Sequence, residues 1–326
     1  MEWVKSAREE FAKSTQAADE FRLEPVRPLS PAPATDPKKV ALGKELFNDA
    51  RLSADGTVSC ATCHNLSFGG VDRLRYSKGV GGKLGGVNAP TVFNSAFQHR
   101  QFWDGRAANL EEQAGGPPVN PLEMASASWD EICKRLEADE GFKKRFLESY
   151  PEGISQKTVC AAIAEFERTL VTPNAPFDKF LKGDKSALTQ EQIEGYELFK
   201  KAKCATCHAG HNLGGQSFEY MGVLRDYFKD RGGATDADKG LYNFQKDDKN
   251  LGKFKTPTLR NVALTYPYFH DGSVSSPEDA AAHMLKYQSG VKLSKGDIKK
   301  IAAFLESLTG EFEGKSLAEK GEKTAQ

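Results

Sequence analysis

The sequence predicts a mainly α-helical protein made of two similar domains, with long loops and little β-structure. The strongest observation is that the pentapeptide Cys-Ala-Thr-Cys-His occurs twice, at residues 60–64 and 204–208. A second observation is that the segments around it recur in both halves in the same order. A third is that apolar residues near the end of each half follow the spacing of an amphipathic helix. We therefore expect one fold that is used twice after an internal duplication.

The first elements are those that lead into each pentapeptide. Residues 1–24 predict a polar helix or a disordered arm, and residues 27–37 predict a proline-rich tether. A helix is expected to enter each pentapeptide, because Gly-x-Glu-Leu-Phe stands at 43–47 and again at 195–199. A glycine-rich loop at 79–86 follows the first pentapeptide.

The later elements repeat at identical spacing. Pro-Thr, Asn and Phe-x-Asp-Gly occur in this order at 90–105 and again at 257–272. Each half then closes with a helix, which we expect around 163–170 and 301–308. Ser294 is the expected N-cap of the second closing helix, because an acidic residue follows it three positions later.

These repeats divide the chain into three predicted parts. Residues 1–37 form the arm and tether, 38–172 the first domain and 173–326 the second domain. A proline-containing linker at 171–176 joins the two domains. A length of 326 residues suits two domains of ordinary size.

The composition is that of a soluble globular protein. Hydrophobic residues make up 39% of the chain and the formal net charge is zero. The chain therefore has no strong electrostatic field that would favour binding to nucleic acid or to an anionic membrane. No apolar stretch is long enough to span a bilayer.

The pentapeptide is the attachment motif for c-type haem, with two cysteines that form thioethers and a histidine that binds iron from one face. The residues so assigned are Cys60, Cys63, His64, Cys204, Cys207 and His208. The two predicted domains are therefore cytochrome c-like haem domains, and their chemistry is redox chemistry. Because c-type haem is normally attached outside the cytoplasm, we expect a periplasmic protein whose export signal has been removed.

The two halves differ in what can occupy the opposite face of each haem. In the second half, Ser276 and Pro277 begin a helix that carries His283 and Met284. Adjacent residues point about 100° apart on a helix, so only one of them can face iron. We expect Met284 to be the ligand, with His283 as the alternative.

In the first half the same distance along the chain reaches Pro117, which cannot bind iron. Gln113 and Glu123 lie nearby. One haem is therefore expected to have protein ligands on both faces, which suits electron transfer. The other is expected to be open, which suits binding of a small oxidant.

These motifs resemble those of the bacterial di-haem cytochrome c peroxidases, from about Leu42 to Gly310. The similar segments are CATCHN, GGVD, NAPTVFN, QFWDGR, NPLEM, FKTPTLRN and YPYFHDGS. The resemblance implies reduction of hydrogen peroxide to water with electrons from a small periplasmic redox protein, either a cytochrome c or a cupredoxin. It also implies a homodimer.

The resemblance assigns roles to particular residues. His64 matches the ligand of the peroxidatic haem, and His208 with Met284 match those of the high-potential haem that receives electrons. Glu123 matches the acid–base residue beside peroxide, and Gln113 a residue that helps to orient peroxide. Trp103, at the position that His270 takes in the repeat, matches the tryptophan between the haems.

The resemblance also implies one calcium ion at the domain interface. Its ligands would be the Asn88 side chain and the backbone carbonyls of Thr265 and Pro267. Amide and carbonyl oxygens are the donors that this hard ion prefers.

One position departs from the family pattern. The family has a distal histidine eight residues before the Asn of NAPTV, where it blocks the peroxidatic haem until the other haem is reduced. Here that position is Val80. Because valine cannot bind iron, we expect the peroxidatic haem to be open in the fully oxidised protein.

Two other functions remain open. One is a di-haem oxidase of the MauG type that modifies a protein substrate, which Met284 disfavours because those enzymes carry Tyr there. The other is a di-haem electron carrier, which Glu123 and Gln113 disfavour. Cys133 and Cys160, outside the haem motifs, are expected to be buried thiols, with a mutual disulfide as the alternative.

Overall fold

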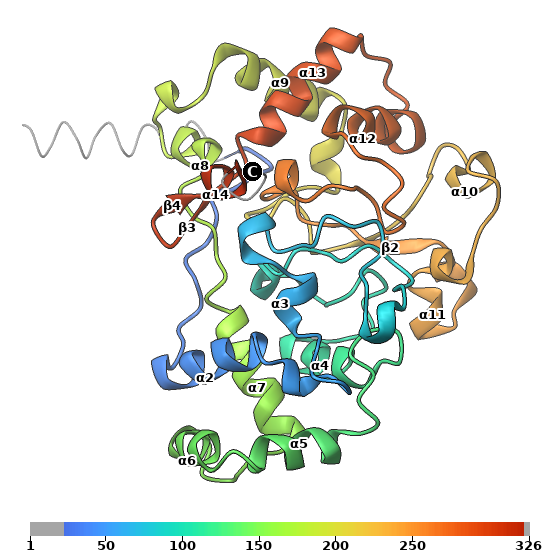
Figure 1. Cartoon of the computed structure of the whole chain (residues 1–326). Helices are drawn as coiled ribbons and strands as arrows, with labels where there is room; N and C mark the ends of the chain where they lie inside the picture. Colours follow the sequence, from blue (N-terminus) through green and yellow to red (C-terminus); the bar gives the residue numbers. More distant parts are fainter. Residues whose placement is uncertain (1–22, 323–326) are drawn as a thin grey trace, which may run out of the picture.

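The computed structural model describes residues 23–322, so nearly all of the arm predicted at 1–24 lies outside the described residues. The predicted fold class is confirmed, since helices predominate and the strands are short (Figure 1). The longer helices are α2 (Pro37–Phe47), α5 (Trp129–Glu137), α6 (Glu140–Ser149), α7 (Gln156–Glu167), α9 (Gln190–Lys201), α12 (Pro277–Met284) and α13 (Lys295–Glu306). The shorter ones are α3 (Cys60–Cys63), α4 (Leu110–Ala114), α8 (Pro176–Leu181), α10 (Tyr227–Asp230), α11 (Tyr242–Gln245) and α14 (Leu317–Glu322).

Within residues 23–322 the strands form two small antiparallel pairs. Strands β1 (Phe218–Tyr220) and β2 (Lys253–Lys255) pair with Glu219 opposite Phe254. Strands β3 (Glu311–Phe312) and β4 (Lys315–Ser316) form a hairpin near the C-terminus.

Two separate hydrophobic clusters form the core, one in each half. Helices α2, α4, α5, α6 and α7 gather at one end of the molecule, and α9, α12 and α13 at the other (Figure 1). The first cluster includes Phe47 and Phe166, and the second includes Phe199 and Phe304. All four rings are nearly completely buried.

Each cluster is built on a helix pair that meets at a glycine. A Cβ atom on Gly43 of α2 would lie 1.9 Å from the carbonyl oxygen of Ala162 on α7. A Cβ atom on Gly195 of α9 would lie 1.9 Å from the carbonyl oxygen of Lys300 on α13. Since only glycine permits this backbone approach, the repeated Gly-x-Glu-Leu-Phe motif corresponds to a repeated helix contact.

The two halves also meet symmetrically at the linker. Asn94 and Asn261, which match in the repeat, both have left-handed backbone angles, with φ of 59° and 61°. Their side-chain amides donate to the same hydroxyl oxygen, Thr172 Oγ1, at 2.8 Å and 3.0 Å. Thr172 is fully buried, so one linker residue lies at the centre of both halves.

Both predicted helix starts in the second half are present. Ser276 caps α12, where its hydroxyl accepts from the backbone N–H of Asp279 at 3.1 Å. Ser294 caps α13 in a capping box with Asp297. In helix α12 this start fixes the face on which Met284 lies.

The C-terminal segment returns to the first half. The Phe312 ring packs edge-on against Phe93 at 5.0 Å, and Leu317 belongs to the first hydrophobic cluster. The predicted domain limits at 37 and 172 stay predictions. Among the helices of residues 23–322, none has the length and apolar character needed to cross a membrane.

Candidate functional site

The two pentapeptides place their histidines in the same way. His64 follows α3, and its Nδ1 lies 3.2 Å from the carbonyl oxygen of Gly70. His208 follows a short turn of 3₁₀-helix, and its Nδ1 lies 3.1 Å from the carbonyl oxygen of Leu213. A carbonyl at Nδ1 fixes the proton there and leaves Nε2 free to bind a metal. Burial lowers the pKa of both imidazoles, which favours the neutral form that binds iron.

A cavity of about 580 Å³ lies beside the second pentapeptide. Its wall contains Cys204, Cys207 and His208, and also Met284 of helix α12. Two thiols, an imidazole and a thioether around one largely apolar cavity are the donor set of a c-type haem with His and Met ligands. The residues present therefore fit that group.

The alternative ligand lies elsewhere. His283 lines a separate hollow together with Tyr227, Arg231 and Asp279, and its Nδ1 is 2.7 Å from the carbonyl oxygen of Asp279. The structure thus brings Met284, and not His283, into the wall of the cavity beside His208.

The predicted acid, Glu123, lies near the first pentapeptide. Glu123 is partly buried, and Asn120 Nδ2 donates to its Oε1 at 2.7 Å. Burial raises the pKa of Glu123, against the opposing effects of Arg106 and of the Asn120 hydrogen bond. Together with burial, the negative charge of Glu123 also helps to raise the pKa of the Cys63 thiol, so the acid lies near the haem-attachment motif.

Gln113 stands in helix α4, which packs on α7. Its carbonyl oxygen accepts from the backbone N–H of Gly116 at 3.1 Å, at the start of the loop that leads to Glu123. Among the described residues, no hydrogen bond joins the side chains of Gln113 and Glu123. Helix α4 and the short turn that follows it thus connect Gln113 to the loop that carries Glu123.

Val80 lies against the same segment. Its backbone N–H donates to the carbonyl oxygen of Glu123 at 2.8 Å, and its side chain packs on the first hydrophobic cluster. The preceding Gly79 is closely packed, since a Cβ atom there would lie 2.2 Å from the carbonyl oxygen of Leu122. The glycine-rich loop is thus held next to Glu123 through its backbone.

Trp103 lies between the two halves. Its indole Nε1 donates to the carbonyl oxygen of Asn88 at 2.9 Å. Its ring meets that of His270 edge-on, with 6.3 Å between the ring centroids. Both side chains line the cavity of the second half, so the two positions that match in the repeat face each other.

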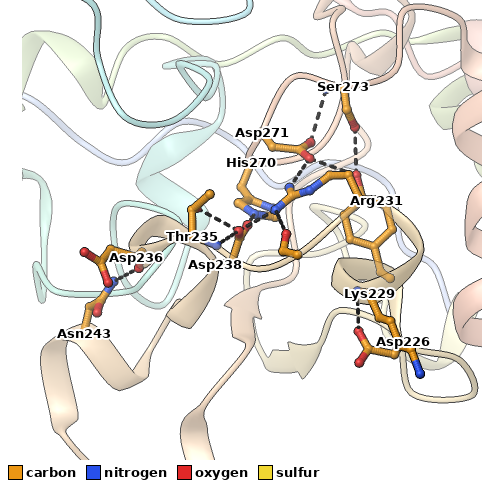
Figure 2. A network of polar contacts seen from close by, with 12 residues as sticks. Asp226, Lys229, Arg231, Thr235, Asp236, Asp238, Asn243, His270, Asp271 and Ser273 are labelled. Carbon is orange, nitrogen blue, oxygen red and sulfur yellow. Dashed lines mark hydrogen bonds and ion pairs between the residues drawn. The ribbon is translucent and has the colours of Figure 1, made fainter.

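A buried ionic network holds His270 (Figure 2). His270 Nε2 lies 2.7 Å from Asp238 Oδ1, and Arg231 forms ion pairs with Asp238 and Asp271. Burial disfavours the carboxylate of Asp238, but the hydrogen bonds from His270 and Arg231 prevail and lower its pKa to about 2. Arg231 and Asp238 were not predicted from the sequence, because they lie in a segment that the first half does not repeat.

The residues proposed as calcium ligands all line the cavity of the second half. Asn88 is 6% exposed, and Asn88, Thr265 and Pro267 all line the cavity wall near Trp103. Asn88 Nδ2 donates to the carbonyl oxygen of Leu74 at 2.9 Å, which orients the amide. Residues 23–322 contain no cluster of three or more His, Cys, Asp or Glu that could hold a metal.

One buried acid was not anticipated. Glu167 on α7 is 5% exposed, and its Oε2 has no hydrogen-bond partner among the described residues. Burial raises its pKa to about 8, with Arg168 opposing and Glu111 adding to the shift. Its counterpart in the repeat is Leu305, which lines the cavity of the second half. The repeat would have indicated this position, had the closing helices been compared residue by residue.

The remaining cysteines are free thiols. Cys160 is buried and Cys133 partly buried, and neither forms a disulfide in the structure. Burial raises the pKa of Cys160 to about 12, so this thiol is protonated near neutral pH.

Comparison with known proteins agrees with this geometry. Residues 37–186 match the family model of the di-haem cytochrome c peroxidases, and residues 192–309 match that of cytochrome c. The chain is 54% identical to cytochrome c peroxidase Ccp of Escherichia coli over 95% of its own length and 66% of that protein. It is 44% identical to cytochrome c551 peroxidase of Nitrosomonas europaea, over 88% of this chain and 85% of the relative. A solved MauG-like protein associated with microbial copper homeostasis has 30% identity and a TM-score of 0.76, over 87% of this chain and 93% of that one.

Proposed function

Because the chain belongs to the family of bacterial di-haem cytochrome c peroxidases, oxidoreductases that act on peroxide, we propose that it reduces hydrogen peroxide in the periplasm. The electrons come from a small redox protein, a cytochrome c or a cupredoxin. The chain spans 66% of the length of the Escherichia coli relative, so the activity proposed is that of the two-haem unit.

The observation that carries this proposal is the difference between the two pentapeptide sites. In the second half a thioether, Met284, shares the cavity wall with His208. Near the first pentapeptide the structure has instead an acid, Glu123, and an aliphatic side chain, Val80. A site with ligands on both faces suits storage of an electron, and an open site suits binding of a small oxidant.

Bound at the two pentapeptides, c-type haems would supply the iron for peroxide binding at the first site and would pass on the electrons of the donor protein. Glu123 moves the proton from the near to the far oxygen of peroxide, so that water can leave as the O–O bond breaks. Its raised pKa suits this role, because a group that titrates closer to neutral pH can both accept and return a proton. Asn120 holds Oε1, which leaves Oε2 to meet the substrate.

Three further residues support the first site in this proposal. Gln113 orients peroxide from helix α4. Trp103 lies between the two halves, where its indole would carry an electron from one haem site to the other. Val80 has no atom that can bind iron, so it would not block a haem held by His64 before reduction.

We also place one calcium ion at the interface, held by Asn88 Oδ1 and the carbonyl oxygens of Thr265 and Pro267. A homodimer is the proposed assembly. The MauG-like alternative gains no support at the ligand position, because Met284 lies there in the cavity wall, where the MauG-type enzymes carry a tyrosine.

Steady-state consumption of peroxide with reduced cytochrome c tests the proposal. We expect turnover both in the fully oxidised and in the half-reduced protein. Turnover confined to the half-reduced protein would contradict the role of Val80. No turnover in either state, with both haems attached, would contradict the peroxidase and leave a carrier or an oxidase.

A further inference from the structure

The interface between the two halves contains a buried lysine that the proposed function does not use. Lys255 ends strand β2, is 5% exposed and lines the same cavity as Trp103. Its Nζ donates to the carbonyl oxygen of Arg100 at 2.9 Å and to the side-chain oxygen of Gln98. Burial lowers its pKa to about 7, although Asp104 acts in the opposite direction. An ammonium group is costly to bury, so this position requires an explanation.

The internal repeat places Lys255 at the position of Asn88. Each lies two residues before the repeated Pro-Thr, in NAPT and in KTPT. In the same register, Gln98 matches Thr265 and Arg100 matches Pro267. The two oxygens that hold the Lys255 ammonium thus come from the counterparts of the two residues proposed to hold calcium with Asn88.

The backbone confirms this correspondence in space. The N–H of Asn88 donates to the carbonyl oxygen of His270 at 2.8 Å. The N–H of Lys255 donates to the carbonyl oxygen of Trp103 at 2.9 Å. Since Trp103 and His270 also match in the repeat, the two halves exchange equivalent hydrogen bonds across their interface.

We propose that the Lys255 ammonium is a tethered cation that takes, between Gln98 and Arg100, the place that calcium takes between Asn88, Thr265 and Pro267. This inference rests on the proposed calcium site. In its protonated form, which prevails below the pKa of about 7, Lys255 carries three donors and a positive charge, and so satisfies oxygen acceptors that would otherwise attract a metal ion. Hard oxygen donors are the ligands that such a metal ion prefers.

The consequence is that each side of the interface is held by a different kind of cation. The Lys255 ammonium is a covalent part of the chain, whereas the calcium ion can be removed. Both act on the short segments that end in Trp103 and His270, the two rings that meet between the halves. Removal of calcium should therefore loosen the segment of His270 and leave that of Trp103 in place.

The test measures calcium content and thermal unfolding of the two-haem protein, with and without EDTA. The substitution K255N places in the second half the side-chain amide that Asn88 provides in the first half. We expect it to bind one more calcium per chain than the wild type, and to lose stability when EDTA removes that ion. K255M should lose stability without gaining calcium, and K253M, on the same strand, serves as the control.

The reverse exchange provides a second test if the Lys255 variants fold poorly. N88K should contain no calcium and should unfold at the same temperature with and without EDTA. N88A should also contain no calcium, but should be less stable than N88K.

Several results would overturn the inference. One is that K255N gains neither calcium nor EDTA sensitivity, as expected if Lys255 is only a counter-charge for a carboxylate of the cofactor. Another is that K255M is as stable as the wild type, and a third is that N88K still binds calcium. The calcium content of the wild type tests the first-half site and the increment in K255N tests its counterpart, so the two proposals can fail separately.

Discussion

The first and second halves of this molecule share a framework but differ in the side chains around the proposed haems. Gly43 and Gly195 allow the same helix contact, and Asn94 and Asn261 bond to the same hydroxyl. By contrast, the closing helices carry Glu167 in one half and Leu305 in the other. The residues that hold the backbone have been kept since the duplication, and those that face the proposed chemistry have diverged.

The largest effect is expected from a substitution of Glu123, the acid that is present only in the first half. Glu123→Gln keeps the shape of the side chain and removes its ability to take a proton. We expect peroxide turnover to fall by about 10² to 10⁴-fold, the usual contribution of general acid–base catalysis. Absorption spectra of the pyridine haemochrome should show two attached haems per chain. A variant with near wild-type turnover would remove Glu123 from the mechanism.

The shared framework can be tested next, at the helix-pair glycines. A methyl group at Gly43 or at Gly195 meets a carbonyl oxygen at 1.9 Å, so the helices must separate. We expect each alanine variant to lose about 3 kcal/mol of stability, as in severe overpacking. Gly296→Ala is the control, because its nearest neighbour outside the helix backbone is 3.7 Å away. Denaturant unfolding should show similar losses for both halves, and a large loss for only one would contradict the equivalence of the two contacts.

A smaller effect is expected where the closing helices differ. The folded protein raises the pKa of Glu167 to about 8, so it binds a proton that the unfolded chain releases near pH 4.5. The stability that this bound proton contributes is complete below about pH 4.5 and is lost as the pH rises toward 8. Glu167→Leu should therefore stabilise the protein by about 2 kcal/mol at pH 8 and by less at pH 5.

The exchange can also be made in the opposite direction. Leu305→Glu should introduce the same pH dependence into the second half, with stability falling as pH rises. Unfolding curves of both variants between pH 5 and pH 8 provide the measurement. If Glu167→Leu has the pH profile of the wild type, the carboxyl group is not buried and protonated as described.

The smallest effect is expected at Val80. Val80→His restores the side chain that the family uses to block the first haem. Because a ligand that occupies the site reduces the open fraction, we expect turnover of the fully oxidised protein to fall by about tenfold. Spectra should change from a mixture with a high-spin haem to two low-spin haems. A wild-type protein that is already entirely low-spin would contradict the expected opening.

Much of the fold could be predicted from local signals. The two pentapeptides, the Gly-x-Glu-Leu-Phe repeat and the N-caps at Ser276 and Ser294 are all visible in sequence, because each depends on residues within one turn of helix. The return of Phe312 and Leu317 to the first cluster could not be predicted in this way, since it depends on a long-range contact with a short and polar segment around it.

The site was predicted less completely. Motif and repeat indicated Met284, but the choice against His283 needed the orientation of α12. Arg231 and Asp238, which form the ionic network with Asp271, lie in a segment without a counterpart in the first half, so the repeat gave no indication of them. The Lys255 contacts required both the register of the repeat and the positions of Gln98 and Arg100 in space.

The linker residue Thr172 sets a limit on how this molecule can be rearranged. Its hydroxyl accepts hydrogen bonds from the side-chain amides of Asn94 in one half and Asn261 in the other. Its backbone N–H donates to Asn94 Oδ1 at 3.0 Å. A chain divided at this point would leave at least one buried asparagine amide without its acceptor. Excision of either half would therefore cost about 1 to 3 kcal/mol at this point alone, because a buried amide would lose its acceptor.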